Sequence, residues 1–347
     1  MDEIRKALGD DVLNYYGFSY GTMLGTVYVN MFPDNVGRAV IDGVMNPLTY
    51  MGGPIFKDTP GDIIDSEELF EAFASECDKA GPERCALAHA NKKNTSKRVR
   101  KFIKNLETEP IVVADSDVPT VLHATTVATL IYGSLYKPKG WADFARVLAN
   151  AMNGNATELV NSALGDFESC PVSDSSSDNG MPGVTCLDTL GNDVGLKQWE
   201  KAGDNADEIS PLFGKGSVWQ YLTCKYWQVG PSERFTGPWN HKLKNKLLII
   251  GNTLDVITPL RNAKTVERLL DGSGVLLHHD GYGHCSTAHK STCTLTYIRQ
   301  LFVNNTYPEN GTKCRVDNDV VLFPDMSLEA KMASGLDDIH DIIAAYN

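Results

Sequence analysis

The chain of 347 residues is 42% hydrophobic and 22% charged, a globular composition that excludes a disordered or fibrous protein. Its formal net charge of −12 argues against a nucleic-acid partner, because phosphate binding requires clustered lysine and arginine. No apolar run is long enough to span a bilayer, so no membrane partner is expected.

The first 55 residues predict a strand, a sharp turn, a helix and a second strand. The short apolar run Val12–Tyr16 precedes the glycine-containing turn Gly17–Gly21, and small and apolar residues follow as far as Phe32. Ala39–Ile41 form a short buried strand that ends in Asp42 and Gly43, as is typical of a parallel sheet covered on both faces. A β-α-β unit therefore opens the chain, which makes it an α/β protein.

The character of the sequence changes twice after this unit. Residues 56–235 alternate amphipathic helical stretches with polar loops, which predicts a mostly helical insertion. The β-α pattern then returns, with a strand at Lys246–Ile250, a helix at Leu260–Leu270 and a further strand in the sequence GVLLHH. We therefore predict an α/β core at residues 1–55 and 236–347, interrupted by a helical lid at 56–235.

Eight cysteines and four Asn-x-Ser/Thr sequons suit an oxidising compartment and predict a secreted protein or one of the secretory pathway. The first residues, MDEIRKALGDD, lack the basic start and apolar centre of a secretory signal, which conflicts with that prediction. Spacing alone does not fix disulfide connectivity. The pairs that would close short or moderate loops are Cys77 with Cys85, Cys170 with Cys186, and Cys293 with Cys314, and the sequon asparagines are Asn94, Asn155, Asn304 and Asn310.

The pattern Gly17-x-Ser19-x-Gly21 lies between the first predicted strand and its helix. In that context the flanking glycines let a strained turn close and leave the serine hydroxyl exposed above the sheet. Ser19 is therefore the candidate nucleophile. The backbone N–H of the next residue, Tyr20, is the candidate oxyanion donor, and the second donor normally comes from a loop after an earlier strand, which this sequence does not contain.

A serine hydroxyl needs a base to take its proton and a carboxylate to orient that base. Asp255 follows the strand KLLII and His284 follows the strand GVLLH, which gives the chain order Ser, Asp, His of α/β hydrolases. The alternative is that these residues only cap turns and helices. A metal site at His278 and His279 is disfavoured because successive side chains of a strand point apart, and we expect neither a metal nor a cofactor.

Three motifs, YYGFSYGT, GNTLDVITP and GYGHCS, resemble the tripeptidyl aminopeptidase-like branch of the prolyl aminopeptidase family of serine exopeptidases. The segment from TGPWNHKL through GTKC is similar to the TAP-like C-terminal domain of that branch, and within the insertion the resemblance rests on VTCLD and LTCKYW. It implies an α/β-hydrolase fold with a helical lid. It also implies cleavage of peptides from their free N-terminus, with Ser19, Asp255 and His284 as the catalytic residues.

The chain departs from the family pattern at two places. Val256 stands where the family usually has proline, which relaxes the loop without moving the carboxylate of Asp255. Family members place four strands and a His-Gly-Gly-Pro-type loop before the nucleophile, whereas eighteen residues precede Ser19 here. The resemblance therefore implies an N-terminally truncated chain that lacks the first strands of the sheet, so that the strand before Ser19 has one unpaired edge.

An aminopeptidase also needs a carboxylate in the lid to meet the ammonium group of its substrate, and Asp188 is the candidate. Trp227 is a candidate for lining the substrate pocket. The alternatives are a solvated loop aspartate and a core aromatic residue. The predicted partner is a peptide or small ester substrate, and the oligomeric state stays open. An ester hydrolase on the same three residues and a catalytically inert fragment are the competing functional predictions.

Overall fold

The computed structural model describes residues 1–90, 92–164 and 180–325, and these fall into two compact units. Within those limits, the first unit draws on residues 1–70, 125–138 and 166–320, and the second on 71–124, 139–165 and 321–347. These units are defined by contacts within each part of the chain, whereas the predicted boundaries at residues 55 and 235 rest on changes in sequence pattern. The division of the chain at residues 55 and 235 therefore stays a prediction.

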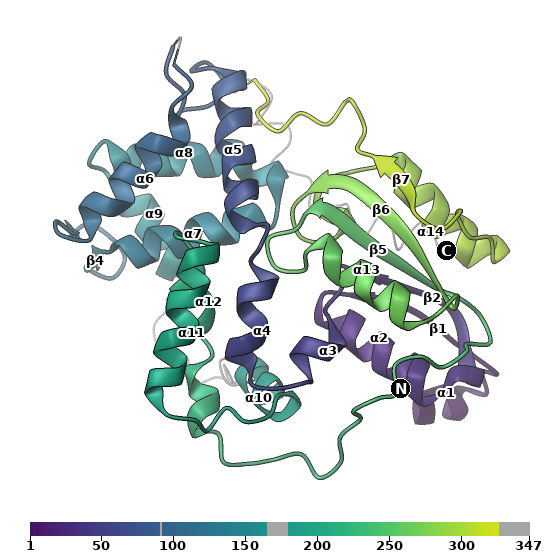
Figure 1. The fold of residues 1–347 in the computed structure, drawn as a ribbon. Helices are drawn as coiled ribbons and strands as arrows, with labels where there is room; N and C mark the ends of the chain where they lie inside the picture. The colour runs from purple at the N-terminus through teal and green to yellow at the C-terminus, as the bar shows by residue number, and fades with distance from the viewer. Residues whose placement is uncertain (91, 165–179, 326–347) are drawn as a thin grey trace. The chain divides into compact units, whose positions relative to one another are not determined.

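The first unit is built on a parallel sheet with the strand order β1-β2-β5-β6-β7 among the described residues (Figure 1). Within that part of the chain β1 lies at one edge, paired to β2 alone. The strands are β1 Leu13–Phe18, β2 Val36–Asp42, β5 Leu247–Leu254, β6 Gly274–Tyr282 and β7 Thr312–Arg315. The chain is thus an α/β protein, as the sequence predicted.

Both faces of the sheet are covered by helices (Figure 1), which explains the apolar runs Ala39–Ile41 and Leu247–Ile250 in its central strands. Ile41 and its same-face neighbours pack against α2 and α13, whereas Val40 packs with the helix α14 on the other face. The side chains of β2 and β5 that form these two clusters are fully buried. The helices of this layer are α1 Asp2–Leu8, α2 Tyr20–Met31, η1 Pro33–Asn35, α13 Leu260–Leu269, η5 Ser286–Ala288 and α14 Thr292–Asn304.

Two predicted strands are longer in the structure than in the sequence reading. The first runs to Phe18, directly before the candidate nucleophile. The strand predicted at Lys246–Ile250 continues through Gly251–Leu254, although glycine, asparagine and threonine are common in turns. Pairing with β6 holds these residues in an extended conformation despite that local preference, so the loop begins only at Asp255.

Further helices of the first unit surround an apolar cluster that contains Phe56, Trp199 and Cys186, with Trp227 packed against it. Phe56 and Trp199 are in tilted ring contact, with centroids 4.7 Å apart. These helices are α3 Pro47–Tyr50, α4 Ile55–Asp62, α7 Ala124–Leu135, η2 Pro138–Gly140, α10 Gly180–Asp188, α11 Leu196–Ile209, α12 Gly214–Trp219 and η4 Leu222–Tyr226, of which α7 and η2 extend by one or two residues into the ranges of the second unit.

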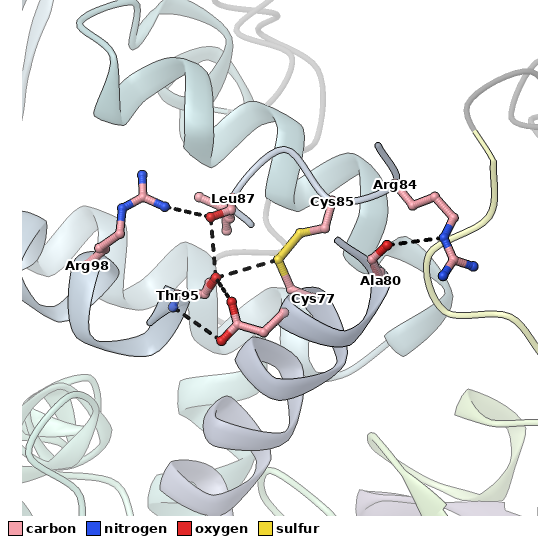
Figure 2. The surroundings of a disulfide bond; sticks show 8 residues. Cys77, Ala80, Arg84, Cys85, Leu87, Thr95 and Arg98 are labelled. Atoms are coloured by element: carbon pink, nitrogen blue, oxygen red, sulfur yellow. Dashed lines mark hydrogen bonds between the residues drawn. A yellow bond between two sulfur atoms is a disulfide. The ribbon is translucent and has the colours of Figure 1, made fainter. Parts of the chain in front are cut away.

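The second unit is mostly helical and is held by the disulfide Cys77–Cys85, whose surroundings Figure 2 shows. Thr95 Oγ1 lies 3.9 Å from Cys77 Sγ and donates a 2.6 Å hydrogen bond to Asp78 Oδ1, which joins the start of α6 to α5. Arg98 Nη1 donates to the main-chain oxygen of Leu87 at 2.6 Å. Its elements are α5 Ser66–Ala80, which begins in the first unit, α6 Thr95–Leu106, β3 Ile111–Val113, β4 Thr120–Leu122, α8 Trp141–Met152 and α9 Thr157–Leu164.

The disulfides confirm two of the candidate cysteine pairs and correct the third. Cys77 pairs with Cys85 and Cys293 pairs with Cys314, but Cys186 pairs with Cys224 rather than with Cys170, which lies outside the described residues. The preference for short loops failed because packing of α10 against η4 brings Cys186 to a cysteine 38 residues away. No helix in the described part of the chain is long and apolar enough to cross a bilayer.

Replacing both Cys186 and Cys224 by serine should lower the free energy of unfolding by about 4 kcal/mol, the loop-entropy value for a closure of this length. Chemical denaturation followed by tryptophan fluorescence measures it. The matching double replacement at Cys77 and Cys85, which closes a loop of 8 residues, should cost less. An equal or larger loss at the short loop would contradict the expectation.

Candidate active site

Ser19 lies on the sharp turn between β1 and α2, with φ 52° and ψ −120°. This is a strained conformation for a residue with a side chain, and such strain persists only where the surroundings impose it. The Ser19 N–H donates to the main-chain oxygen of Asp42 at 3.0 Å, and Thr22 Oγ1 donates back to the oxygen of Ser19 at 2.6 Å. The turn is therefore anchored to β2 on one side and to the first turn of α2 on the other.

Two glycines allow α2 to approach the sheet closely enough for this turn. A Cβ atom on Gly17 would lie 2.5 Å from the main-chain oxygen of Gly21, and one on Gly25 would lie 2.9 Å from a methyl carbon of Ile41. The ring of Tyr15 fills the remaining space, and its hydroxyl donates to the oxygen of Gly21 at 2.6 Å. The spacing Gly17, Gly21, Gly25 is thus a packing requirement around one tyrosine as well as a turn motif.

Asp255 follows β5 directly and is fully buried. Its Oδ1 accepts hydrogen bonds from the main-chain N–H groups of Ile257 at 3.0 Å and Thr258 at 2.9 Å, and its Oδ2 accepts from Thr258 Oγ1 at 2.8 Å. Burial by itself raises the pKa of this carboxyl, but the charge of His284 and these hydrogen bonds bring it below its ordinary value. Asp255 is therefore held as a carboxylate.

His284 follows β6 and places Nδ1 3.0 Å from Asp255 Oδ1 and 3.1 Å from Oδ2. Because an ionised carboxylate only accepts hydrogen bonds, Nδ1 carries the proton in the neutral ring and Nε2 is the free base. Burial lowers the pKa of His284, but the charge of Asp255 and the hydrogen bond to it raise that pKa above its ordinary value. The His284 N–H donates to the oxygen of Tyr136 at 3.0 Å, and the Tyr136 ring packs edge-on against the imidazole.

The turn of Ser19 and the loop of His284 both lie against the end of β2. A Cβ atom on Gly43 would lie 3.2 Å from His284 Cε1 and 2.4 Å from Cys285 Sγ. Cys285 Sγ is 3.5 Å from the same Asp42 oxygen that holds the Ser19 N–H. Among residues 1–90, 92–164 and 180–325 no hydrogen bond joins the Ser19 hydroxyl to His284 Nε2. Such bonds often tighten only when substrate is bound.

Replacing Gly43 by alanine should lower the free energy of unfolding by about 2 kcal/mol, since the new methyl would meet Cys285 Sγ and since φ at this position is +69°. It should also slow any reaction of Ser19, because the displaced loop carries His284. Thermal unfolding and covalent labelling of Ser19 measure the two effects. Gly53→Ala is the control, because nothing lies within 4 Å of its Cβ position and its φ is not positive. Equal behaviour of the two variants would contradict this reading of the loop.

Asp188 lies at the end of α10 and is brought close to the residue that follows the nucleophile. The hydroxyl of Tyr20 donates to Asp188 Oδ2 at 2.7 Å, and the hydroxyl of Tyr50 lies 3.5 Å from the same oxygen. Burial and the neighbouring Asp188 carboxylate raise the pKa of Tyr20, so its phenol stays protonated. Arg234 donates through Nη2 to the main-chain oxygen of Asp188. Asp188 is thus partly buried at a helix end and bonded to the side chain of Tyr20, while its role in substrate binding stays a prediction.

The other two predicted site residues are Tyr20, the candidate oxyanion donor, and Trp227, the candidate pocket residue. Tyr20 is the first residue of α2, so its N–H has no partner inside the helix and is free to act as a donor. Trp227 packs against the cluster around Trp199, which is the core position named as its alternative. No group of three or more metal-ligating side chains occurs in the described residues, and His278 and His279 bond separately to Thr253 and Thr294.

The sequence reading missed three residues of this site. Thr258 Oγ1 lies 3.1 Å from His284 Nδ1 and also binds Asp255, and its position in the GNTLDVITP motif was the signal for it. Asp42 is a charged residue directly after the apolar run Ala39–Ile41 of β2, which is also a readable signal. Tyr136 directly follows α7 and is far in sequence from the other site residues, and nothing in the local sequence points to it.

Comparison with known proteins gives the same class as the fold and the site. A family model described as the α/β-hydrolase fold matches residues 1–109, and one described as TAP-like protein matches residues 210–314. The parallel sheet, the strand-turn-helix at Ser19 and the two loops that bring Asp255 to His284 agree with both matches. The chain therefore has the α/β-hydrolase fold and is similar to TAP-like proteins.

Curated relatives carry the comparison further. The chain is 26% identical over 303 residues to the tripeptidyl aminopeptidase of Streptomyces lividans, which covers 84% of this chain and 52% of that protein. It is 24% identical over 339 residues to the serine protease Hip1 of Mycobacterium tuberculosis, covering 90% of this chain and 60% of Hip1. A putative hydrolase, YuaR, of Escherichia coli is 23% identical over 289 residues, covering 82% of this chain and 54% of YuaR. The chain thus spans about half the length of the curated relatives that it matches.

Proposed function

We propose that this protein is a serine hydrolase that cleaves peptide bonds through an acyl-enzyme, with Ser19 as the nucleophile, His284 as the base and Asp255 as its orienting carboxylate. The observation that carries the proposal is the pair of hydrogen bonds of 3.0 and 3.1 Å between His284 Nδ1 and the carboxylate of Asp255 at the strand ends beside Ser19. Matches to a tripeptidyl aminopeptidase and a serine protease support it.

In the proposed mechanism, Ser19 Oγ attacks the carbonyl carbon of the substrate while His284 Nε2 takes the hydroxyl proton. The carbonyl oxygen becomes negative in the tetrahedral intermediate and accepts a hydrogen bond from the Tyr20 N–H. The protonated imidazole then gives its proton to the leaving amine, and water repeats the sequence on the acyl-enzyme. The Asp255 carboxylate stabilises the imidazolium in both halves of the reaction, without itself taking the proton.

We further propose that the substrate is a short peptide with a free N-terminus and that Asp188 binds its ammonium group. The Asp188 carboxylate is fixed by Tyr20, whose N–H is the proposed oxyanion donor, which ties recognition of the amine to the reacting centre. A fixed anion reduces the free-energy cost of removing an ammonium group from water. Tyr20, Tyr50 and Arg234 together keep Asp188 in place.

A substrate panel tests the proposed reaction. Aminoacyl and tripeptidyl amides are compared with their N-acetylated forms and with short acyl esters, using Ser19→Ala as the blank. Turnover of free-N-terminal peptides is expected. Turnover of esters alone would support the competing ester-hydrolase function, and no Ser19-dependent turnover by folded protein would support an inert chain.

The proposed ammonium site is tested on the same panel. Asp188→Asn keeps the shape of the side chain, so it should raise KM for the free amine about tenfold and leave the acetylated substrate unchanged, as expected for loss of one ion pair. Asp193→Asn, at an exposed loop position, is the matched control. Equal losses on free and acetylated substrates would remove Asp188 from recognition.

We also propose that the protein is made in, or passes through, an oxidising secretory compartment. Three disulfides support this, and the sequon asparagines Asn155, Asn304 and Asn310 are exposed. Mass measurement of the native protein before and after reduction and deglycosylation tests it. Fully reduced, unmodified cysteines in freshly isolated protein would contradict the proposal.

A further inference from the structure

Asp42 occupies the end of β2, between the strand that carries Ser19 and the strand that leads to Asp255. It pairs in register with Phe18 of β1 and with Ile250 of β5. Its side chain is fully buried. A carboxylate in such a place costs free energy unless its oxygens accept hydrogen bonds and a positive charge lies nearby.

The contacts of Asp42 join the two halves of the proposed active site. Its main-chain oxygen accepts the Ser19 N–H at 3.0 Å. Its carboxylate accepts the N–H of Ser286 at 2.9 Å through Oδ1 and the hydroxyl of Ser286 at 2.5 Å through Oδ2. Tyr16, three residues before Ser19, donates to Oδ2 at 3.1 Å. One residue thus fixes both the nucleophile turn and the loop two residues beyond His284.

The charge of Asp42 also acts on His284. The neighbouring Asp42 carboxylate raises the pKa of His284, in the same direction as Asp255. Burial raises the pKa of Asp42 itself to about 6, against the hydrogen bonds from Ser286 and Tyr16, which lower it. Asp42 is therefore ionised at neutral pH, where the reaction needs an anion beside the imidazolium that forms during proton transfer.

We propose that Asp42 is a positioning residue for the reaction, which holds the His284 loop against the Ser19 turn and adds a second buried negative charge that stabilises protonated His284. This inference rests on the proposed roles of Ser19 and His284. The titratable groups that face Asp42 or His284 from the elements packed around them are Tyr16 on β1, Asp255 after β5, Tyr136 after α7 and Cys285 after β6.

The test replaces Asp42 by asparagine and measures the rate of Ser19 labelling by a fluorophosphonate probe as a function of pH. Loss of the charge lowers the pKa of His284, so the base stays unprotonated to lower pH and the acidic limb of the rate profile should move to lower pH. The rate on the plateau should fall by roughly ten- to a hundredfold, because the imidazolium is less stabilised and the loop is less well placed. An anchor that acted only on folding would leave the limb where it is.

Two further variants make the outcome decisive. Asp2→Asn removes another buried carboxylate, which accepts hydrogen bonds from Tyr28 and Asn35 and not from the residues around Asp42. This variant should not move the acidic limb of the rate profile. Tyr16→Phe removes one donor to Asp42, which raises the pKa of Asp42 and leaves less of its carboxylate ionised on the acidic limb. The limb should therefore move in the same direction by less, and this variant tests the inference if Asp42→Asn does not fold. This inference alone would be overturned if the wild type is labelled but the acidic limb of folded Asp42→Asn does not move. If Asp42→Asn does not fold, an unmoved limb in Tyr16→Phe would overturn it. Failure of the wild type to label would overturn the proposed function itself.

Discussion

Replacing His284 by alanine should reduce the rate at which Ser19 is acylated by about 10⁴- to 10⁶-fold. The variant lacks the proposed base, and the serine hydroxyl is a poor nucleophile while it keeps its proton. The buried Asp255 would then lose the hydrogen bond from His284 and the imidazolium that forms during proton transfer, so its pKa should rise and its carboxylate become less stable. Fluorophosphonate labelling followed by intact-protein mass spectrometry measures the rate.

The matched control for this variant is His241→Ala. His241 is also a partly buried histidine of the first unit, and its Nδ1 lies 3.3 Å from Asn30 Oδ1. We expect its labelling rate to stay within about twofold of wild type, as for a residue outside the reacting centre. Comparable losses in the two variants would show that labelling reports general stability rather than proton transfer.

Replacing Asp255 by asparagine should lower the acylation rate by about 10⁴-fold while the protein stays folded. An amide side chain can donate to Nδ1, which favours the tautomer with the proton on Nε2, and that tautomer cannot accept the proton of Ser19. The oxygen of the amide can still accept from the N–H groups of Ile257 and Thr258, which preserves the turn after β5. The loss should therefore appear in the rate and much less in the thermal midpoint.

Asp280→Asn provides the comparison for Asp255. Asp280 lies on β6 and accepts from Thr253 Oγ1 at 2.6 Å, but it does not contact His284. Its replacement should leave labelling close to wild type. A wild-type rate in Asp255→Asn would remove the orienting carboxylate from the mechanism, whatever its distance from His284.

The parallel sheet was predictable from the sequence because its central strands are buried on both faces and therefore contain short, fully apolar runs, Ala39–Ile41 and Leu247–Ile250. The alternating packing of Val40 and Ile41 toward opposite faces is the structural form of that signal. The predicted strand stops short of the end of β5 because Gly251, Asn252 and Thr253 are residue types common in turns, and the pairing with β6 keeps this segment extended. Local propensity is a weak guide where a neighbouring strand supplies the hydrogen bonds.

The contact between His284 and Asp255 was predictable because parallel strands end at one edge of the sheet, so residues directly after two strands are brought together. Contacts made by the helical segments were not predictable in this way. The pairing of Cys186 with Cys224 and the packing of Tyr136 on His284 depend on how helices far apart in sequence meet. Asp188 was chosen for its chemistry, and its hydrogen bond to Tyr20 gives it a position that the sequence alone could not supply.

The central claim is that Ser19 is the nucleophile, and one measurement tests it most directly. The folded protein is treated with a fluorophosphonate, digested, and the modified peptide is identified by mass spectrometry. The account predicts a single adduct on Ser19 that is absent from Ser19→Ala of equal thermal stability. An adduct on a different residue, or labelling that persists in Ser19→Ala, would contradict it.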